Sequence, residues 1–170
     1  MVINCAAVNQ DQAMKEKYPG VELAYDLAVD SYDAVIKRID VMNGRLQTMI
    51  AFATTTTAVV PTVANARGLT FRSWFFYLAI SVFGLIILIG TTEQLRGTIK
   101  MLNPDLFFEK WLDLSEWEFK KDFIAFAGES FDHNKKLLDR KWRASVYVTV
   151  LFVLEVVFLV AWVGAAALRR

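Results

Sequence analysis

Three apolar runs constrain this chain more than any other feature of its sequence. They cover residues 48–66, 71–91 and 144–168, and each is close to the roughly 20 residues that a helix needs to cross a bilayer. Over the whole chain 55% of the residues are hydrophobic, which is too many for an ordinary soluble domain. The sequence therefore predicts an all-α integral membrane protein with three transmembrane helices embedded in a lipid bilayer.

The distribution of basic residues predicts the orientation in the membrane. The segment before the first run contains five Lys and Arg, and the segment between the second and third runs contains ten. The first interspan loop contains only Arg67 and Arg72. Because cytoplasmic segments are enriched in Lys and Arg, we expect the N-terminus and the central segment to be cytoplasmic and the C-terminus to lie outside.

The residues before the first run form a coiled-coil seam. Apolar residues alternate in steps of four and three, as in coiled coils, and comprise Val21, Tyr25, Ala28, Tyr32, Val35, Ile39, Met42, Leu46 and Met49. No cluster of Pro or Gly separates this seam from the first run. We expect one helix, with residues 20–47 as a cytoplasmic stalk and 48–66 as the first transmembrane helix. The stalk packs either on the second stalk of its own chain or on a neighbouring copy.

A second stalk helix is predicted to follow Leu114, with Ser115 as its N-cap. A hydroxyl residue followed three positions later by the carboxylate of Glu118 is the order of a capping box. The helix would cover residues 115–143 and continue into the third run, 144–168, without a breaker. Two long cytoplasmic stalk helices would thus extend from the first and third spans.

The remaining segments are predicted to connect these helices. Residues 1–19 are expected to form a mobile tail, and residues 92–114 a cytoplasmic extension of the second span. This extension should stay helical until Asn103, where Pro104 disfavours helix and starts a short reversing element.

The first transmembrane run is unusually polar. It contains four consecutive hydroxyl side chains, namely Thr54, Thr55, Thr56 and Thr57. It also contains a row of small residues at four-residue spacing, which permits close helix contacts: Thr54, Ala58, Thr62 and Ala66. We therefore expect this helix to be surrounded by protein or to line a wet path.

Glu155 is the single carboxylate inside the third run. An ionised side chain at mid-bilayer costs about 2.5–3.5 kcal/mol on insertion scales, so Glu155 should face protein or water. Its natural partners are the hydroxyls of residues 54–57, which lie at a similar depth. Two interpretations stay open: a buried structural hydrogen bond, or a pore and gate site formed by Glu155 with Thr54, Thr55, Thr56 and Thr57.

Charged residues of the first stalk form two further candidate sites. Close to the predicted membrane surface lie three residues that would couple the stalk to the span: Arg38, Asp40 and Arg45. Off the apolar seam lie four acids that form either a solvated face or a docking strip for a partner: Glu22, Asp26, Asp30 and Asp33.

No motif of an enzyme is present. The sequence contains no Gly-rich phosphate loop, no zinc-protease pair and no nucleophile elbow, and its one cysteine forms no metal cluster. Its net charge of +1 shows no nucleic-acid footprint. We expect no catalytic site, no cofactor, no metal and no nucleic-acid partner.

Two stretches carry a family resemblance. RIDVMNGRLQTMIAF, at residues 38–52, resembles the segment that opens the first span in the Pycsar transmembrane effectors and SLATT proteins of bacterial antiphage defence. WLDLSEWEFKKDFIAFAGESFDHNKKLLDRKW, at 111–142, is similar to the cytoplasmic helix of bacterial membrane proteins with this layout. The resemblance implies an oligomeric effector of the bacterial inner membrane. Since the chain carries no cyclic-nucleotide-binding domain, it also implies a separate cytoplasmic sensor or signalling partner.

Two functions follow as hypotheses. The first is a homo-oligomeric inner-membrane effector or channel-like protein that perturbs the membrane on a cytoplasmic signal, in antiphage defence. The alternative is a membrane scaffold or accessory subunit that docks a soluble cytoplasmic partner through its stalk helices.

Overall fold

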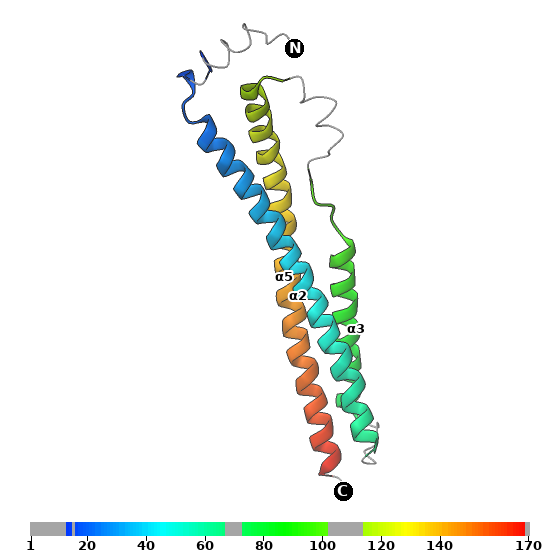
Figure 1. Cartoon of the computed structure of the whole chain (residues 1–170). Coiled ribbons are helices and arrows are strands. Elements are labelled where there is room, and N and C mark those ends of the chain that lie inside the picture. Colours follow the sequence, from blue (N-terminus) through cyan, green and yellow to red (C-terminus); the bar gives the residue numbers. More distant parts are fainter. Residues whose placement is uncertain (1–12, 15, 67–72, 102–113, 169–170) are drawn as a thin grey trace. The chain divides into compact units, whose positions relative to one another are not determined.

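Three long helices make up the described part of the chain. The computed structural model describes residues 13–14, 16–66, 73–101 and 114–168. The helices are α2 (Val21–Ala66), α3 (Trp74–Leu95) and α5 (Glu116–Ala167), and these described residues contain no strand (Figure 1). Each of the three is long and apolar enough to cross a membrane. The all-α prediction and the three candidate spans are therefore confirmed.

Helix α2 is continuous, as its seam predicts. It begins at Val21, carries the acidic Glu22 in its first turn, and passes through Gly44 and Pro61 to Ala66. A negatively charged side chain in the first turn stabilises a helix, because it lies at the positive end of the helix dipole. The predicted seam residues are buried or half-buried; Val35 is buried, and Ile39 and Leu46 are fully buried.

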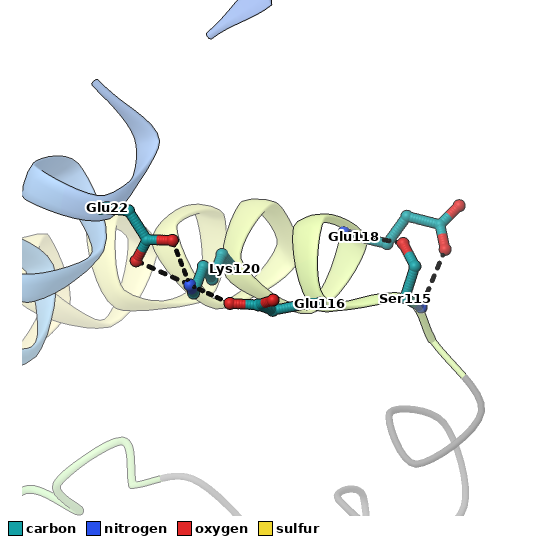
Figure 2. Close-up of polar contacts among 5 residues, drawn as sticks. All are labelled: Glu22, Ser115, Glu116, Glu118 and Lys120. Carbon is teal, nitrogen blue, oxygen red and sulfur yellow. Dashed lines mark hydrogen bonds and ion pairs between the residues drawn. The ribbon is translucent and has the colours of Figure 1, made fainter. Parts of the chain in front are cut away.

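Helix α5 begins at the predicted capping box. The Glu118 N–H donates to Ser115 Oγ at 3.4 Å, and the Ser115 N–H donates to Glu118 Oε2 at 3.2 Å (Figure 2). Two N–H groups that no helical carbonyl can reach are thus satisfied by side chains. From this start α5 continues without interruption to Ala167.

Helix α3 ends earlier than the sequence predicts. It stops at Leu95, so the helical extension to Asn103 is wrong in the described part, residues 96–101. Gly97 has a φ of 95°, a left-handed conformation that a helix cannot contain. Asn134 forms two hydrogen bonds with the backbone of Lys100. Its Oδ1 accepts from the Lys100 N–H at 3.0 Å, and its Nδ2 donates to the Lys100 carbonyl at 3.1 Å.

Two other predicted segments lie mostly or wholly outside the described residues. The tail at 1–19 is described only from residue 13, with residue 15 excepted, and the reversing element at Asn103 and Pro104 is not described.

The structure divides into two compact units, and both contain parts of α2 and α5. The first unit comprises Met1–Arg38 and Thr98–Leu137. Aromatic rings from α2 and the residues just before it pack on α5 here. The ring centroid of Tyr18, which precedes α2, lies 5.8 Å from that of Trp117, and the ring centroid of Tyr25 lies 5.1 Å from that of Phe123. Aromatic pairs at such distances add to the stability that burial of their area supplies.

The second unit comprises Ile39–Gly97 and Leu138–Arg170, and all three helices contribute to it. Its aliphatic cores are two clusters, one of Leu46, Ala53, Ile86 and Val148, and one of Ala64, Ala79, Leu159 and Trp162. A Cβ atom added at Gly90 would lie 2.6 Å from Ile50 Cδ1, so α3 approaches α2 closely at this glycine.

Helix α5 carries a buried seam that contains polar residues. Its fully buried positions recur in steps of mostly three or four along the helix, which is the spacing of a packed helix face. Five of these positions are polar or charged: Ser130, Asn134, Lys141, Ser145 and Glu155. Buried polar groups need partners, so these five residues direct attention to candidate sites.

Candidate functional site

Glu155 lies inside the second unit and bonds to one threonine. Its side chain is 0% exposed, and Thr57 Oγ1 donates a hydrogen bond to Glu155 Oε1. The other carboxylate oxygen, Oε2, is buried and has no hydrogen-bond partner among the described residues. The structure thus places the acid against the first span and leaves half of its acceptor capacity unused.

The other threonines of the predicted gate do not reach Glu155. Thr54 donates to the carbonyl of Ile50 at 2.8 Å, and Thr55 donates to the carbonyl of Ala51 at 2.9 Å. Both are exposed, whereas Thr56 is half-buried. Successive residues of a helix point in directions about 100° apart, so one threonine faces inward while its neighbours face outward.

The small-residue row of α2 faces away from the unit that contains it. Thr54, Ala58, Thr62 and Ala66 are all exposed, and Thr62 donates to the carbonyl of Ala58 at 2.7 Å. The outer faces of α3 and α5 are different, because they carry large aliphatic side chains: Ile80, Leu85, Leu88, Val153, Val157 and Val160. Helix α2 therefore exposes a row of small and hydroxylated residues beside a few bulky apolar ones, Phe52, Val59 and Val63, whereas bulky apolar residues dominate the outer faces of α3 and α5.

A cavity of about 360 Å³ lies between α2 and α5 of the second unit. Thr56 and Val60 line it from α2, and Val156, Val160 and Gly164 line it from α5. Its walls are almost entirely apolar, so an apolar side chain or an acyl chain suits it better than a polar ligand.

A buried cation is a feature that the sequence reasoning missed. Lys141 is 2% exposed, and its Nζ donates to the carbonyl of Glu93 at 2.8 Å, while Arg140 Nε pairs with the Glu93 carboxylate at 2.8 Å. Burial lowers the pKa of Lys141, with Arg140 lowering it and Glu93 opposing the shift. The signal was available in the spacing, since Lys141 falls on the α5 seam seven residues after Asn134.

The predicted coupling residues do not meet at one place. Arg38, Asp40 and Arg45 are all exposed on α2. Of these, Arg45 has a partner that belongs to the same unit, because its guanidinium lies 5.9 Å from the centroid of the Trp142 ring. A cation over an aromatic face is a modest attraction at an exposed position.

Of the four predicted docking acids, two form ion pairs within the described residues and two do not. Glu22 bonds to Lys120, which also bonds to Glu116, with each N–O distance 2.6 Å (Figure 2). Asp33 lies 3.5 Å from Lys37 on the same helix. Asp26 and Asp30 are exposed and form no ion pair with another described residue. An available acidic strip is therefore reduced to these two.

Comparisons with known proteins leave the family open. Neither the protein-family models, nor the curated proteins, nor the solved structures contain a match to this chain. The resemblance of residues 38–52 and 111–142 to antiphage effectors thus stays a prediction from the sequence.

Proposed function

We propose that this chain is a homo-oligomeric, channel-like effector of the bacterial inner membrane that perturbs the membrane on a cytoplasmic signal. The observation that carries the proposal is the outer face of α2, where Thr54, Ala58 and Thr62 are exposed on a helix apolar enough to span a bilayer. This face suits contact with another copy.

The physical reason lies in how helices associate within lipid. Apolar side chains gain little from leaving one apolar solvent for another, so association depends on close packing and hydrogen bonds. Small residues permit that approach, whereas the bulky outer residues of α3 and α5 pack well against acyl chains. We therefore assign α2 to the subunit contacts and to any central path, and α3 to the lipid.

In this proposal Glu155 belongs to the closed state. Its bond to Thr57 ties α5 to α2, and its free Oε2 is a ready acceptor once the two helices move apart. Glu155 and Thr57 remain the gate candidates, with Thr54 and Thr55 exposed on the outer side of the same helix and Thr56 lining the cavity between α2 and α5. The trigger is a cytoplasmic sensor or partner, and the role in antiphage defence rests on the sequence resemblance alone.

The test is membrane potential after induced expression in bacteria, with subunit stoichiometry measured in lipid nanodiscs. The wild type is expected to be oligomeric and, when its cytoplasmic signal is present, to depolarise the membrane. Thr62→Leu, which fills the small-residue row, should abolish both properties. The matched control is Leu88→Phe on the outer face of α3, which should abolish neither. A wild-type chain that is monomeric in lipid would overturn the proposal.

The scaffold is the second candidate, favoured by the two exposed acids of the first unit. Asp26 and Asp30 have no ion pair within the described residues and are placed to meet a basic partner. A soluble partner captured by wild type but not by Asp26→Lys or Asp30→Lys, with membrane potential unchanged in all three, would favour this function.

A further inference from the structure

A pocket of about 470 Å³ lies in the first unit, between the residues that open α2 and the first turns of α5. Residues 17–21 and Ala24 line it on one side, and Trp117, Lys121 and Ile124 line it on the other. Small-molecule sites in proteins have volumes of roughly 300–1,000 Å³. The pocket is therefore large enough to hold one small molecule.

The walls of this pocket are largely apolar. Val21, Ala24 and Ile124 contribute aliphatic surface, and Tyr18 and Trp117 contribute aromatic rings whose centroids lie 5.8 Å apart. An apolar chain that moves from water onto such walls gains free energy in proportion to the area it buries. The walls therefore suit the apolar part of a ligand.

Two cationic side chains lie over the aromatic walls. Lys17 Nζ lies 5.4 Å from the centroid of the Tyr18 ring, and Lys121 Nζ lies 5.6 Å from that of the Trp117 ring. Both lysines are exposed, and neither forms an ion pair with a described residue. Lysine stems cover apolar surface while their charged ends stay in water, so both ammonium groups are placed to meet an anion at the mouth of the pocket.

No carboxylate belongs to the walls of this pocket. Three acids lie in the first turns of α2 and α5, and each is engaged by another group (Figure 2). Glu22 and Glu116 bind Lys120, and Glu118 accepts from the Ser115 N–H. The charge at the pocket is therefore positive, which favours an anionic ligand over a cationic one.

The neighbouring cavity determines which way such a ligand lies. This second cavity has a volume of about 450 Å³, shares Ile124 with the first and includes Asp132 in its walls. Because a carboxylate repels an anion, the charged end of the ligand belongs at Lys17 and Lys121 and its apolar end points toward Ile124. A molecule with one charged end and one apolar chain fits this arrangement.

We propose that the pocket binds a free fatty acid, that is, a single apolar chain that ends in a carboxylate. The chain packs on Val21, Ala24 and Ile124, and the carboxylate pairs with Lys17 and Lys121. The inference goes beyond the proposed function and does not rest on it, because the site is complete within one copy of the chain and lies outside the predicted spans.

The test is photolabelling of the full chain in lipid nanodiscs with dodecanoic acid that carries a diazirine, followed by mass spectrometry of the peptides. Saturable labelling is expected within residues 17–24 and 117–124. Label in the predicted spans, which the probe reaches through the bilayer, is the internal reference. Unlabelled dodecanoate should compete for the pocket. Dodecanol and dodecylammonium have the same chain without a negative charge, and at equal free concentration in water they should compete about tenfold less well, the scale of two exposed ion pairs.

Variants test the two parts of the site separately. Ala24→Trp fills the pocket and should lower its labelling about tenfold relative to the spans, whereas Ala34→Trp, at an exposed alanine of α2 that lines neither cavity, should not. Lys17→Gln combined with Lys121→Gln should remove the advantage of dodecanoate over dodecanol, and Lys136→Gln, at an exposed position of α5, should preserve it.

Three results would overturn the proposal. The first is labelling confined to the predicted spans, and the second is competition by dodecanol as strong as that by dodecanoate. The third is labelling of the pocket by a phospholipid with the same photoreactive chain that equals labelling by the free acid, since the ligand would then be a membrane lipid.

Discussion

The two units use the same pair of helices with different side chains. In the first unit Glu22 meets Lys120, and in the second unit Thr57 meets Glu155, and both pairs are separated by 98 residues. The first contact is surrounded by tyrosine, phenylalanine and tryptophan rings, and the second by two aliphatic clusters. In each unit the α5 residue thus follows its α2 partner by the same 98 positions, but the side chains around the contact differ.

The difference indicates the surroundings that each unit requires. The outer face of the first unit is charged, and the carboxylates of its ion pairs, such as Asp33 and Glu22, are more than half exposed, which is typical of a surface in water. The outer face of the second unit is mostly aliphatic, with Leu85, Leu88 and Val160 well exposed. Such a face suits lipid, and the expectation of a water-facing and a lipid-facing unit can be tested by variants in each.

The largest effect on the free energy of unfolding is expected for a substitution in the aliphatic core of the second unit. Trp162 is fully buried, and its ring lies 5.0 Å from that of Phe76, so Trp162→Ala should lower the free energy of unfolding by about 3–5 kcal/mol. The measurement is unfolding in bicelles. Trp142→Ala, at a half-exposed position of the same helix, is the control and should cost about 0.5–1 kcal/mol. Equal costs would contradict the packing described for this unit.

The next effect concerns the amide that binds the Lys100 backbone in the first unit. Asn134 is fully buried, so Asn134→Ala removes both of its hydrogen bonds to Lys100 and should cost about 1–3 kcal/mol. The Lys100 N–H loses this partner, whereas the Lys100 carbonyl still accepts from the Tyr32 hydroxyl at 3.1 Å. Hydrogen exchange at the Lys100 amide should accelerate. His133→Ala removes only a 3.3 Å contact to the Thr98 carbonyl and should leave that exchange rate nearly unchanged.

A smaller effect is expected at the carboxylate of the second unit. Thr57→Val removes the hydroxyl that binds Glu155 and should cost about 1 kcal/mol, the scale of hydrogen bonds between membrane helices. Thr54→Val should cost less, because that hydroxyl bonds only to its own helix. Glu155→Gln retains an acceptor and should be nearly silent in stability. A change of membrane potential with Glu155→Gln would then indicate a gating role.

The smallest effect concerns the pH dependence of stability, because the pKa values of Lys141 and Lys120 shift in opposite directions. Burial lowers the pKa of Lys141 below 10.5, so its unfolded state binds the proton more tightly and stability should rise as pH approaches 10.5. Burial also lowers the pKa of Lys120, but the bonds and charges of Glu116 and Glu22 outweigh it and raise the pKa above 10.5. Its stabilisation is complete below 10.5 and is lost as pH rises through the folded pKa.

Variants separate the two lysines. Unfolding is measured between pH 9 and 11 at a roughly constant ionic strength, which keeps the screening of exposed charges comparable. Lys141→Met should remove the rise in stability that is expected as pH approaches 10.5. Lys120→Met should remove the loss of stability that is expected as pH rises further. A slope that neither variant changes would show that other groups control the pH dependence.

Most of the helical architecture could be predicted from the sequence. The alternating steps of four and three residues from Val21 predicted the long helix α2, and Ser115 with Glu118 predicted the start of α5. Both are local signals, because they depend on spacings within one or two turns. The early end of α3 was missed, because it coincides with the left-handed Gly97, whereas other glycines of the chain, such as Gly44 and Gly84, lie inside continuous helices.

The sequence predicted that Glu155 bonds to one of the threonines at 54–57 but could not predict which one. Four consecutive threonines point in four directions, and the rotation of α2 against α5 decides which one faces the acid. That rotation comes from the packing of the whole seam, to which residues such as Leu46, Ala53 and Val148 contribute. Single-residue assignments at a helix contact therefore need the tertiary structure.

The separation of 98 residues between bonded partners also has a consequence for synthesis. Ribosomes add about 5–20 residues per second, so Thr57 leaves the ribosome on the order of 5–20 s before Glu155. During this interval the seam of α2 has no α5 to cover it, and α3 is completed within the first half of it. Nascent α2 must therefore be sheltered by the translocon, a chaperone or α3 until the last helix arrives.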